Sequence, residues 1–216
     1  IPMARGLGSS SACIVAGLLG ANALLGCPLT QRQMLTLATA IEGHPDNVAP
    51  AMLGGFVTSV YDEGLVYTVK KNIDPDLAFA AFVPDFRLLT SKARAVLPEM
   101  VPRKDAVYNL SRAALATAAF CDGDYGLLGV ATKDALHQRY RLPLIEGGEE
   151  VFELAQDLCA QAVYISGAGP TIIAVVHKDD DEFFARAGEA LPKSDKLSHF
   201  TLYRLLADNA GAAVEA

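Results

Sequence analysis

The chain has 216 residues, of which 51% are hydrophobic and 20% charged, and its formal net charge at pH 7 is −7. This apolar fraction is enough for a hydrophobic core and excludes an intrinsically disordered chain, and the length suits one large domain or two small ones. No apolar run reaches the roughly 18 residues of a membrane span without polar interruption. The acidic balance argues against a general nucleic-acid binder. We therefore expect a globular protein whose partner is neither a membrane nor a nucleic acid.

The first residues predict a buried helix. Small apolar residues lie on all sides of the segment 10–26, with Ser9 and Ser10 as candidate N-caps and Gly26 as the stop. Just before this helix comes the glycine-rich run Arg5-Gly-Leu-Gly-Ser-Ser-Ser11. Such loops normally follow a strand, and no residues precede this one that could form it. We therefore expect that an N-terminal segment is missing and that the domain of residues 1–74 is incomplete.

Further along, local signals predict a second helix and a hairpin. Thr30 and Gln33 have the spacing of a capping box, which predicts a helix to Glu42 that Gly43 ends. The segment 43–50 holds two prolines and predicts a constrained loop or a helix start. Strands are predicted at 56–60 and 65–69 with a turn at 62–64, and a domain boundary at 72–75 divides the chain into domains 1–74 and 75–216.

The second domain is predicted to mix strands and helices. Its strands are expected at 77–84, 162–166, 171–176 and 200–206, and its helices at 91–97, 104–121, 125–136, 149–161 and 179–191. They alternate without a regular βαβ period, so the fold class is α+β rather than doubly wound α/β.

The cysteines also bear on the class of protein. Cys13, Cys27, Cys121 and Cys159 lie far apart and form no Cys-x-x-Cys pair. This spacing predicts buried thiols of a reduced, cytoplasmic protein rather than a zinc site or a disulfide framework.

Two glycine-rich turns are candidates for binding an anion. In the run Gly6-Leu7-Gly8-Ser9-Ser10, two glycines would let the backbone approach a phosphate, a helix N-terminus follows, and the serine hydroxyls could bind phosphate or Mg²⁺. It is neither a Walker A loop nor a Gly-x-Gly-x-x-Gly run, and a plain turn remains the alternative. For Ser166-Gly-Ala-Gly-Pro170, a tight turn between strands is the simpler interpretation.

Charged and polar side chains give a second group of candidates. Glu42 is a candidate metal ligand, because Mg²⁺ in proteins takes one or two carboxylates together with phosphate oxygens. His44, Asp46 and Asn47 follow it within five residues, although a surface loop could have this composition. Arg94, Arg139 and Arg141 are candidate anion clamps in an acidic chain, or ordinary solvated arginines.

Four motifs in one order resemble a known family. Pro2-x-x-x-Gly-Leu-Gly-Ser-Ser10 resembles the ATP-binding loop of the GHMP kinases, and Ser166-Gly-Ala-Gly-Pro170 resembles their C-terminal glycine motif. Between them, Glu42-Gly-His-Pro-Asp-Asn-Val-Ala-Pro-Ala51 is similar to the signature of the homoserine kinase branch. The segment His137-Gln-Arg-Tyr-Arg-Leu-Pro-Leu-Ile145 is similar to that branch too.

The resemblance implies a fold and a reaction. The N-terminal domain would resemble the second domain of ribosomal protein S5, and the C-terminal domain would be ferredoxin-like, with the active site between them. ATP would phosphorylate the side-chain hydroxyl of L-homoserine, a step to threonine, with Mg²⁺ as cofactor. The absent N-terminal segment would complete the adenine pocket, so the chain alone is not expected to be active. A homodimer stays open.

The resemblance also implies roles for individual residues. The ATP phosphate loop would comprise Pro2, Arg5, Gly6, Leu7, Gly8, Ser9, Ser10 and Ser11. Ser10 and Glu42 would hold Mg²⁺. The substrate would meet His44, Asn47, Thr90, Arg94, Arg141, Gly167 and Ala168, with the two arginines on its carboxylate. His44, Asp46 and Asn47 are the candidate catalytic residues.

One position departs from the mevalonate-type relatives. They carry a catalytic Asp seven residues before a Gly-Gly pair, and here that position is Asn47, before Gly54. Asn cannot accept a proton, so the sequence predicts transfer by positioning and charge stabilisation. Asp46 is a candidate base whose register is unfavourable. The alternatives are another GHMP small-molecule kinase and a non-catalytic ligand-binding protein with this fold.

Overall fold

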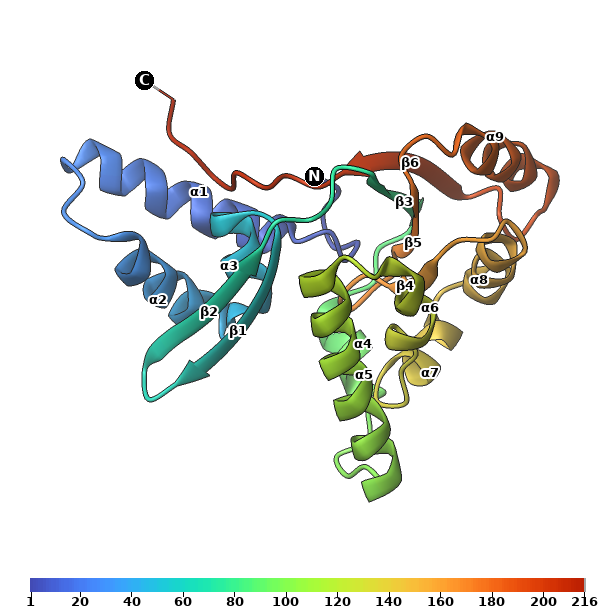
Figure 1. The fold of residues 1–216 in the computed structure, drawn as a ribbon, viewed down its shortest axis with the longest axis horizontal. Coiled ribbons are helices and arrows are strands. Elements are labelled where there is room, and N and C mark those ends of the chain that lie inside the picture. The colour runs from blue at the N-terminus through green and yellow to red at the C-terminus, as the bar shows by residue number, and fades with distance from the viewer. Residues whose placement is uncertain (216) are drawn as a thin grey trace. The chain divides into compact units, whose positions relative to one another are not determined.

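The computed structural model describes residues 1–215, which divide into two compact units (Figure 1). The first comprises Gly8–Ile73 with Ile1 and the residues from Ala207 on, and the second comprises Asp74–Leu206 with Pro2–Leu7. The predicted domains 1–74 and 75–216 stay a prediction. Within the described residues, none of the helices combines the length and the hydropathy that crossing a bilayer requires.

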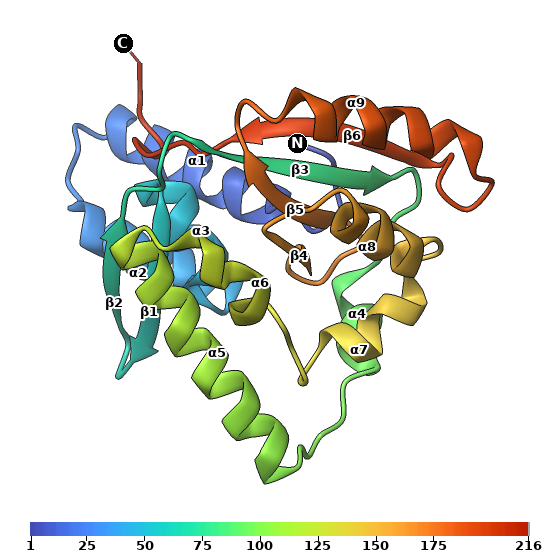
Figure 2. The same ribbon diagram turned by 45° about the vertical axis from the view of Figure 1, so that its right-hand side comes forward.

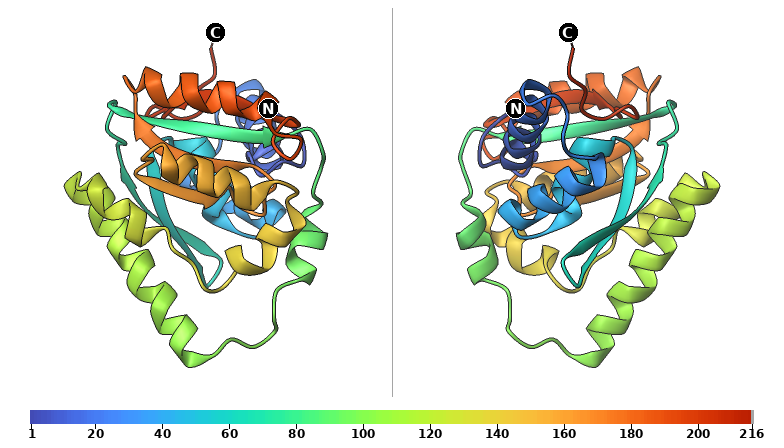
Figure 3. Two further views of the ribbon diagram at one scale, coloured as in Figure 1. Left: turned by 90° about the vertical axis from the view of Figure 1, so that its right-hand side faces the viewer. Right: turned by 90° about the vertical axis from the view of Figure 1, so that its left-hand side faces the viewer.

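The first unit packs helices against a hairpin. The helices are α1 (Ser9–Leu24), α2 (Gln31–Glu42) and α3 (Pro45–Leu53), and the antiparallel strands are β1 (Phe56–Asp62) and β2 (Leu65–Lys71). The right-hand view of Figure 3 shows α2 in front of the hairpin. The buried core that joins them consists of Val15, Met34, Leu35, Ala38, Val48, Ala49, Met52 and Val66.

Local sequence signals explain the limits of α2 and α3. The backbone N–H of Gln33 donates to Thr30 Oγ1 over 3.3 Å and the N–H of Thr30 donates to Gln33 Oε1 over 2.9 Å, which confirms the capping box. Gly43 ends α2 with a φ of 93°, as predicted. Of the two predictions for 43–50, the helix start is confirmed, because His44 is the N-cap of α3 and Pro45 its first residue.

The prediction that α1 is a buried helix was wrong. Its buried residues are Ser11, Val15 and Asn22, and the side chain of Leu24 is 90% exposed. The N-cap is Gly8, not Ser9 or Ser10, and it contributes no side-chain hydrogen bond. A helix with small apolar residues on all sides has no polar face. Its composition therefore could not show which side packs on α2 and α3.

The cysteine prediction also needs correction. All four thiols are free, as predicted, but each of them is exposed rather than buried. Cys27 and Cys159 lie just beyond the ends of helices at positive φ, 59° and 62°, where the chain turns at the surface. A cysteine's place in a turn therefore outweighs the preference of its side chain for the interior.

The second unit is built on a four-stranded antiparallel sheet (Figure 2). Its strands are β3 (Leu77–Pro84), β4 (Ala162–Ile165), β5 (Ile172–His177) and β6 (Phe200–Leu206), in the order β4-β5-β3-β6. Numbered from one to four along the chain, this is the order 2-3-1-4 of a ferredoxin-like sheet. The helices are α4 (Thr90–Ala95), α5 (Arg103–Asp122), α6 (Leu128–Ala131), α7 (Gln138–Arg141), α8 (Gly148–Asp157) and α9 (Asp181–Ala190).

Strand β3 is apolar on both faces because both are covered. Ala78, Ala80 and Phe82 join the core formed with α8 and α9, and Ala81 and Val83 pack on the opposite side with Ile173. In the left-hand view of Figure 3, α8 and α9 lie over one face of the sheet. The α+β fold class and the ferredoxin-like second domain are therefore confirmed.

One predicted helix of this unit is wrong. The segment 125–136 is not a single helix but a 3₁₀ turn (Tyr125–Leu127), the short helix α6 and a loop. The helix stops because the Asp134 carboxylate accepts hydrogen bonds from the backbone N–H groups of Leu136, His137 and Gln138, which start α7 instead. The other predicted helices and strands are present, with ends that differ by a few residues.

Candidate functional site

The first glycine loop is held by its backbone in the second unit. The hydroxyl of Ser166 donates to the carbonyl of Gly6 over 2.7 Å, and the N–H of Thr171 donates to that of Arg5 over 3.3 Å. At Gly6, with a φ of +78°, a Cβ would lie 2.3 Å from the Ser166 carbonyl oxygen. Only glycine fits this close approach, and the two glycine-rich motifs are thus in direct contact.

Arg5 points to the protein rather than into the loop. Its guanidinium donates to the backbone carbonyls of Pro84, over 2.7 Å, and of Asp85, at the end of β3. The side chain therefore anchors the loop to the sheet. A phosphate contact from Arg5 stays a prediction.

The N-terminus of α1 is suited to an anion. Gly8 is the N-cap with a φ of 69°. Glycine has no side chain, so the N-cap residue gives the backbone N–H groups of the first turn no hydrogen bond. The backbone N–H groups of Ser9 and Ser10 come first in a helix of 16 residues. The positive end of the helix dipole and these N–H groups favour a negatively charged group there.

A carboxylate lies beside this helix start. Glu42, at the end of α2, accepts a hydrogen bond from Ser10 Oγ over 3.0 Å and from Ser11 Oγ over 2.9 Å. Ser11 is 1% exposed, so its hydroxyl is committed to Glu42 and orients it. One carboxylate and one accessible hydroxyl are the hard oxygen ligands that Mg²⁺ takes together with phosphate oxygens.

The next residues begin α3. His44 Nδ1 lies against a carboxylate oxygen of Asp46, whose side chain is 72% exposed. Asn47 is exposed in the first turn of the same helix. Ser10, Glu42, His44 and Asn47 thus all lie at the ends of α1, α2 and α3, which pack on one another in the first unit.

The predicted carboxylate clamp lies in the second unit. Arg141, on α7, donates from Nε to the carbonyl of Ala93 over 3.1 Å and from Nη1 to that of Gly167 over 3.0 Å. It therefore ties α4, which carries Thr90 and Arg94, to the second glycine turn, which carries Gly167 and Ala168. Arg139 instead donates to Asp105 over 2.6 Å and takes no part in this clamp.

The positive charge of Arg94 acts on Arg141. Burial and then the positive charge of Arg94 lower the pKa of the Arg141 guanidinium, and the charge of Asp134 partly offsets this lowering. Two cations facing one region are stabilised by a bound anion. Their placement suits the carboxylate of an amino acid.

Sequence reasoning missed three residues that hold this clamp in place: Asp134, Asn109 and Gln138. Asp134 caps α7, the Asn109 side-chain amide bonds Asp134, and Gln138 accepts from the N–H of Ile165 over 2.8 Å. The signal that could have found Asp134 is a capping residue three positions before a helical His-Gln-Arg-Tyr-Arg run, which the apolar pattern of 125–136 obscured.

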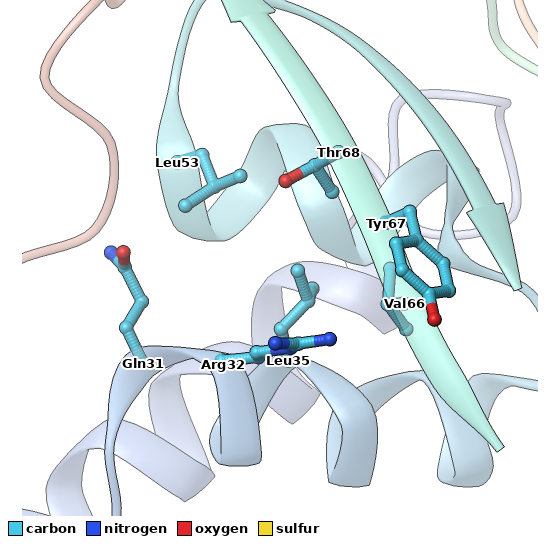
Figure 4. A pocket seen from close by; sticks show the side chains of 7 residues that line it. All are labelled: Gln31, Arg32, Leu35, Leu53, Val66, Tyr67 and Thr68. Carbon is cyan, nitrogen blue, oxygen red and sulfur yellow. The ribbon is translucent and has the colours of Figure 1, made fainter.

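A preformed metal cluster or a pocket would be an alternative candidate site. Among residues 1–215, no cluster of three or more His, Cys, Asp or Glu side chains could hold a metal ion by itself. A pocket of about 350 Å³ between α2 and the hairpin is lined by Gln31, Arg32, Leu35, Leu53, Val66, Tyr67 and Thr68 (Figure 4). Its cation, Arg32, lies 5.7 Å from the centroid of the Tyr67 ring, and none of the predicted site residues lines it.

Comparison with known proteins decides the family. Residues 1–55 match the GHMP kinases N terminal domain and residues 116–193 match the GHMP kinases C terminal model. A homoserine kinase of Clostridium beijerinckii is 48% identical over 99% of this chain and 71% of its own length. One of Caldicellulosiruptor saccharolyticus is 45% identical over 99% and 70%. The chain belongs to the homoserine kinase branch of the GHMP kinases.

Solved structures agree with this assignment. The crystal structure of homoserine kinase from Cytophaga hutchinsonii is similar with a TM-score of 0.86 and 30% identity, covering 98% of this chain and 69% of that one. The L. major mevalonate kinase, at 16% identity and a TM-score of 0.70, shares the fold. The resemblance drawn from the four motifs is thus confirmed.

Proposed function

We propose that this GHMP kinase transfers the γ-phosphoryl group of ATP to the side-chain hydroxyl of L-homoserine, giving O-phospho-L-homoserine. The observation that carries the proposal is the similarity, over nearly the whole chain, to relatives named homoserine kinase. The clamp of Arg94 and Arg141 supports an amino-acid substrate, because two arginines suit a carboxylate.

The phosphates of ATP would be bound by the backbone of the first glycine loop. Gly6 and Gly8 hold the loop at positive φ, and the first N–H groups of α1 would donate to the phosphates. Pro2, Leu7 and Ser9 shape the same loop. The contact of Ser166 with Gly6 fixes the loop before the nucleotide binds.

Ser10 and Glu42 would hold Mg²⁺. Bound there, the metal ion would neutralise the charge that develops on the transferring phosphoryl group. Ser11 would keep the carboxylate oriented, and phosphate oxygens would complete the ligand set.

Homoserine would be bound through its carboxylate and its side-chain hydroxyl. Arg94 and Arg141 would bind the carboxylate and Thr90, Gly167 and Ala168 would surround the amino acid. His44 and Asn47 would meet the substrate at the start of α3. Because Asn47 cannot accept a proton, we propose that it orients the hydroxyl, and that positioning and charge stabilisation carry the transfer.

A substrate panel tests the proposal. ATP turnover of the full-length enzyme, which is also the protein for the kinetic measurements below, is measured with L-homoserine, L-serine, L-threonine, mevalonate and galactose, with and without Mg²⁺. We expect homoserine to give the highest kcat/KM and Mg²⁺ to be required. A preference for mevalonate or galactose would point to another GHMP small-molecule kinase, and binding without turnover to a non-catalytic ligand-binding protein. A cytoplasmic location and a homodimer stay predictions.

A further inference from the structure

Asp134 is a buried acid that lies outside the proposed set of ATP and homoserine contacts. Its side chain is 6% exposed. Oδ2 accepts from the backbone N–H of His137 and of Gln138, each over 2.6 Å, and of Leu136 over 3.1 Å. Oδ1 accepts from Asn109 Nδ2 over 2.6 Å. A buried carboxylate with this many donors is held in one orientation.

These bonds fix the start of the helix that carries Arg141. In α7, the N–H of Arg141 donates to the carbonyl of His137 over 3.0 Å, so the residue capped by Asp134 is also the one that sets the Arg141 backbone. Asn109, on α5, holds the other side of the turn, because its Oδ1 accepts from the N–H of Ala135 over 2.8 Å. A helix of four residues has little stability of its own and depends on such a cap.

Charge supports the same arrangement. Burial by itself would raise the pKa of Asp134, but the hydrogen bonds from Asn109, Gln138 and His137 outweigh it and lower the pKa below its ordinary value. Asp134 is thus an anion before the first residue of α7. Its charge partly offsets the effects of burial and of Arg94, which lower the pKa of Arg141. The carboxylate therefore holds the backbone at the start of α7 through hydrogen bonds, and it favours the charged form of Arg141.

We propose that Asp134 is a positioning residue for homoserine: by capping α7 it sets the Arg141 guanidinium against Ala93 and Gly167 in the orientation that receives the substrate carboxylate. These two contacts and a third, of Nη1 with His137 Nδ1 at 3.4 Å, use Nε and Nη1, so within the described residues Nη2 is left for the ligand. This role rests on the proposed function, because it concerns recognition of that substrate.

The test compares Asp134→Asn with Asp180→Asn. Asp180 makes the matched contact in α9, where its carboxylate accepts from the N–H of Phe183 over 2.9 Å, away from the clamp. For Asp134→Asn we expect the KM for homoserine to rise roughly tenfold, and the KM for ATP to change less than about twofold, since the misplacement is confined to the clamp. Asp180→Asn should leave both unchanged. Equal changes in both Michaelis constants would overturn the proposal.

A double-mutant cycle asks whether Asp134 acts through Arg141. Adding Asp134→Asn to Arg141→Lys should raise the KM for homoserine much less than it does in the parent, because the fork that Asp134 positions is already lost. Additive effects would contradict the proposal. If Asp134→Asn folds poorly, Asn109→Ala keeps the carboxylate and should raise the same KM in the same direction by a smaller factor; no change would count against the proposal.

An NMR measurement separates this inference from the proposed function. The Arg141 Nε–H, bonded to the Ala93 carbonyl, should exchange with solvent faster in Asp134→Asn than in the parent or Asp180→Asn. Unchanged exchange would overturn the positioning role even in an active kinase. Faster exchange in a protein that does not phosphorylate homoserine would refute the proposed function and keep Asp134 as the residue that sets Arg141.

Discussion

At the scale of single residues, the Glu42 carboxylate is the best-defined part of the site in the first unit. Two hydroxyls, from Ser10 and Ser11, donate to its two oxygens, so it is oriented before any metal ion binds. Gly6 matters for a different reason: a Cβ at this position would clash with the Ser166 carbonyl oxygen. The predictions at this scale therefore test a charge, a proton acceptor and a close backbone contact.

Glu42→Gln should lower kcat by roughly two orders of magnitude, because it removes a charge from the proposed Mg²⁺ site and keeps the shape. Raising the Mg²⁺ concentration should recover part of the rate. Steady-state kinetics over a Mg²⁺ series measures this. The control is Glu189→Gln. Glu189 is an exposed acid on α9 that pairs with Lys193. A near-normal rate for Glu42→Gln at ordinary Mg²⁺ would show that Glu42 only ends a helix.

Asp46→Asn tests the candidate base. Asp46 is 72% exposed and its carboxylate contacts His44, while Asn47 holds the position that carries the catalytic Asp in mevalonate-type relatives. We expect kcat to fall less than about tenfold, with the acidic limb of the pH–rate profile unchanged. A loss of about 10²–10⁴-fold together with disappearance of that limb would identify Asp46 as the general base.

Gly6→Ala tests the contact between the two glycine motifs. The added Cβ would lie 2.3 Å from the Ser166 carbonyl oxygen at a φ of +78°, so the loop must move. We expect the KM for ATP to rise at least roughly tenfold. Gly17→Ala, in α1, is the control, since its Cβ would meet nothing within 4 Å and alanine favours a helix. Equal KM values for ATP in Gly6→Ala and Gly17→Ala would contradict the role of this contact.

At the scale of elements, caps decide where the site residues fall. The capping box at Thr30 starts α2, and Gly43 ends it directly after Glu42. Asn22 fixes the preceding turn, because its side chain both donates to the carbonyl and accepts from the N–H of Leu29, over 3.1 and 2.9 Å. The length of α2 therefore follows from short-range contacts at its two ends.

Thr30→Ala should lower the free energy of unfolding by about 1 kcal/mol, the usual cost of losing an N-cap hydroxyl. Urea unfolding followed by circular dichroism measures it. Thr36→Ala is the control on the same helix: its hydroxyl donates to the Arg32 carbonyl within the helix, so its loss should change stability little. If the two variants are equally stable, the capping box contributes nothing measurable.

At the scale of the whole molecule, stability should depend on pH through a histidine that has no assigned role in the chemistry. Burial lowers the pKa of His137 below its ordinary value of 6.5; the Asp134 carboxylate opposes this shift, and the charge of Arg141 adds to it. The unfolded chain thus holds the proton more tightly than the folded one. The contribution is fully present above pH 6.5 and is lost as the pH falls through the folded value.

We therefore expect the free energy of unfolding to fall between about pH 7.5 and pH 5, and His137→Gln to flatten that decline. Asp134 adds a second loss at lower pH, since its lowered pKa means that acid protonates a carboxylate whose hydrogen bonds stabilise the folded state. Urea midpoints of the parent and His137→Gln over a pH series measure both. Parallel curves for the two proteins would show that His137 does not contribute.

The sequence by itself determined the features that depend on neighbours along the chain. The capping box of Thr30, the hairpin at 62–64, the doubly buried strand β3 and the order of the four motifs needed only spacings of two to four residues or a short run of residue types. That is why the α+β class and the GHMP kinase resemblance were available before the structure, and why candidate site residues in α1, α2 and α3 could be proposed.

Only the tertiary structure decided which side chains those elements bring together. The bond from Asn109 to Asp134 and the bond from Arg5 to the Pro84 carbonyl join residues far apart in sequence, and no local pattern predicts either of them. The packed face of α1 and the exposure of the cysteines were decided in the same way. A local pattern fixes the backbone of a segment, but burial and long-range hydrogen bonds depend on which surfaces meet when the chain folds.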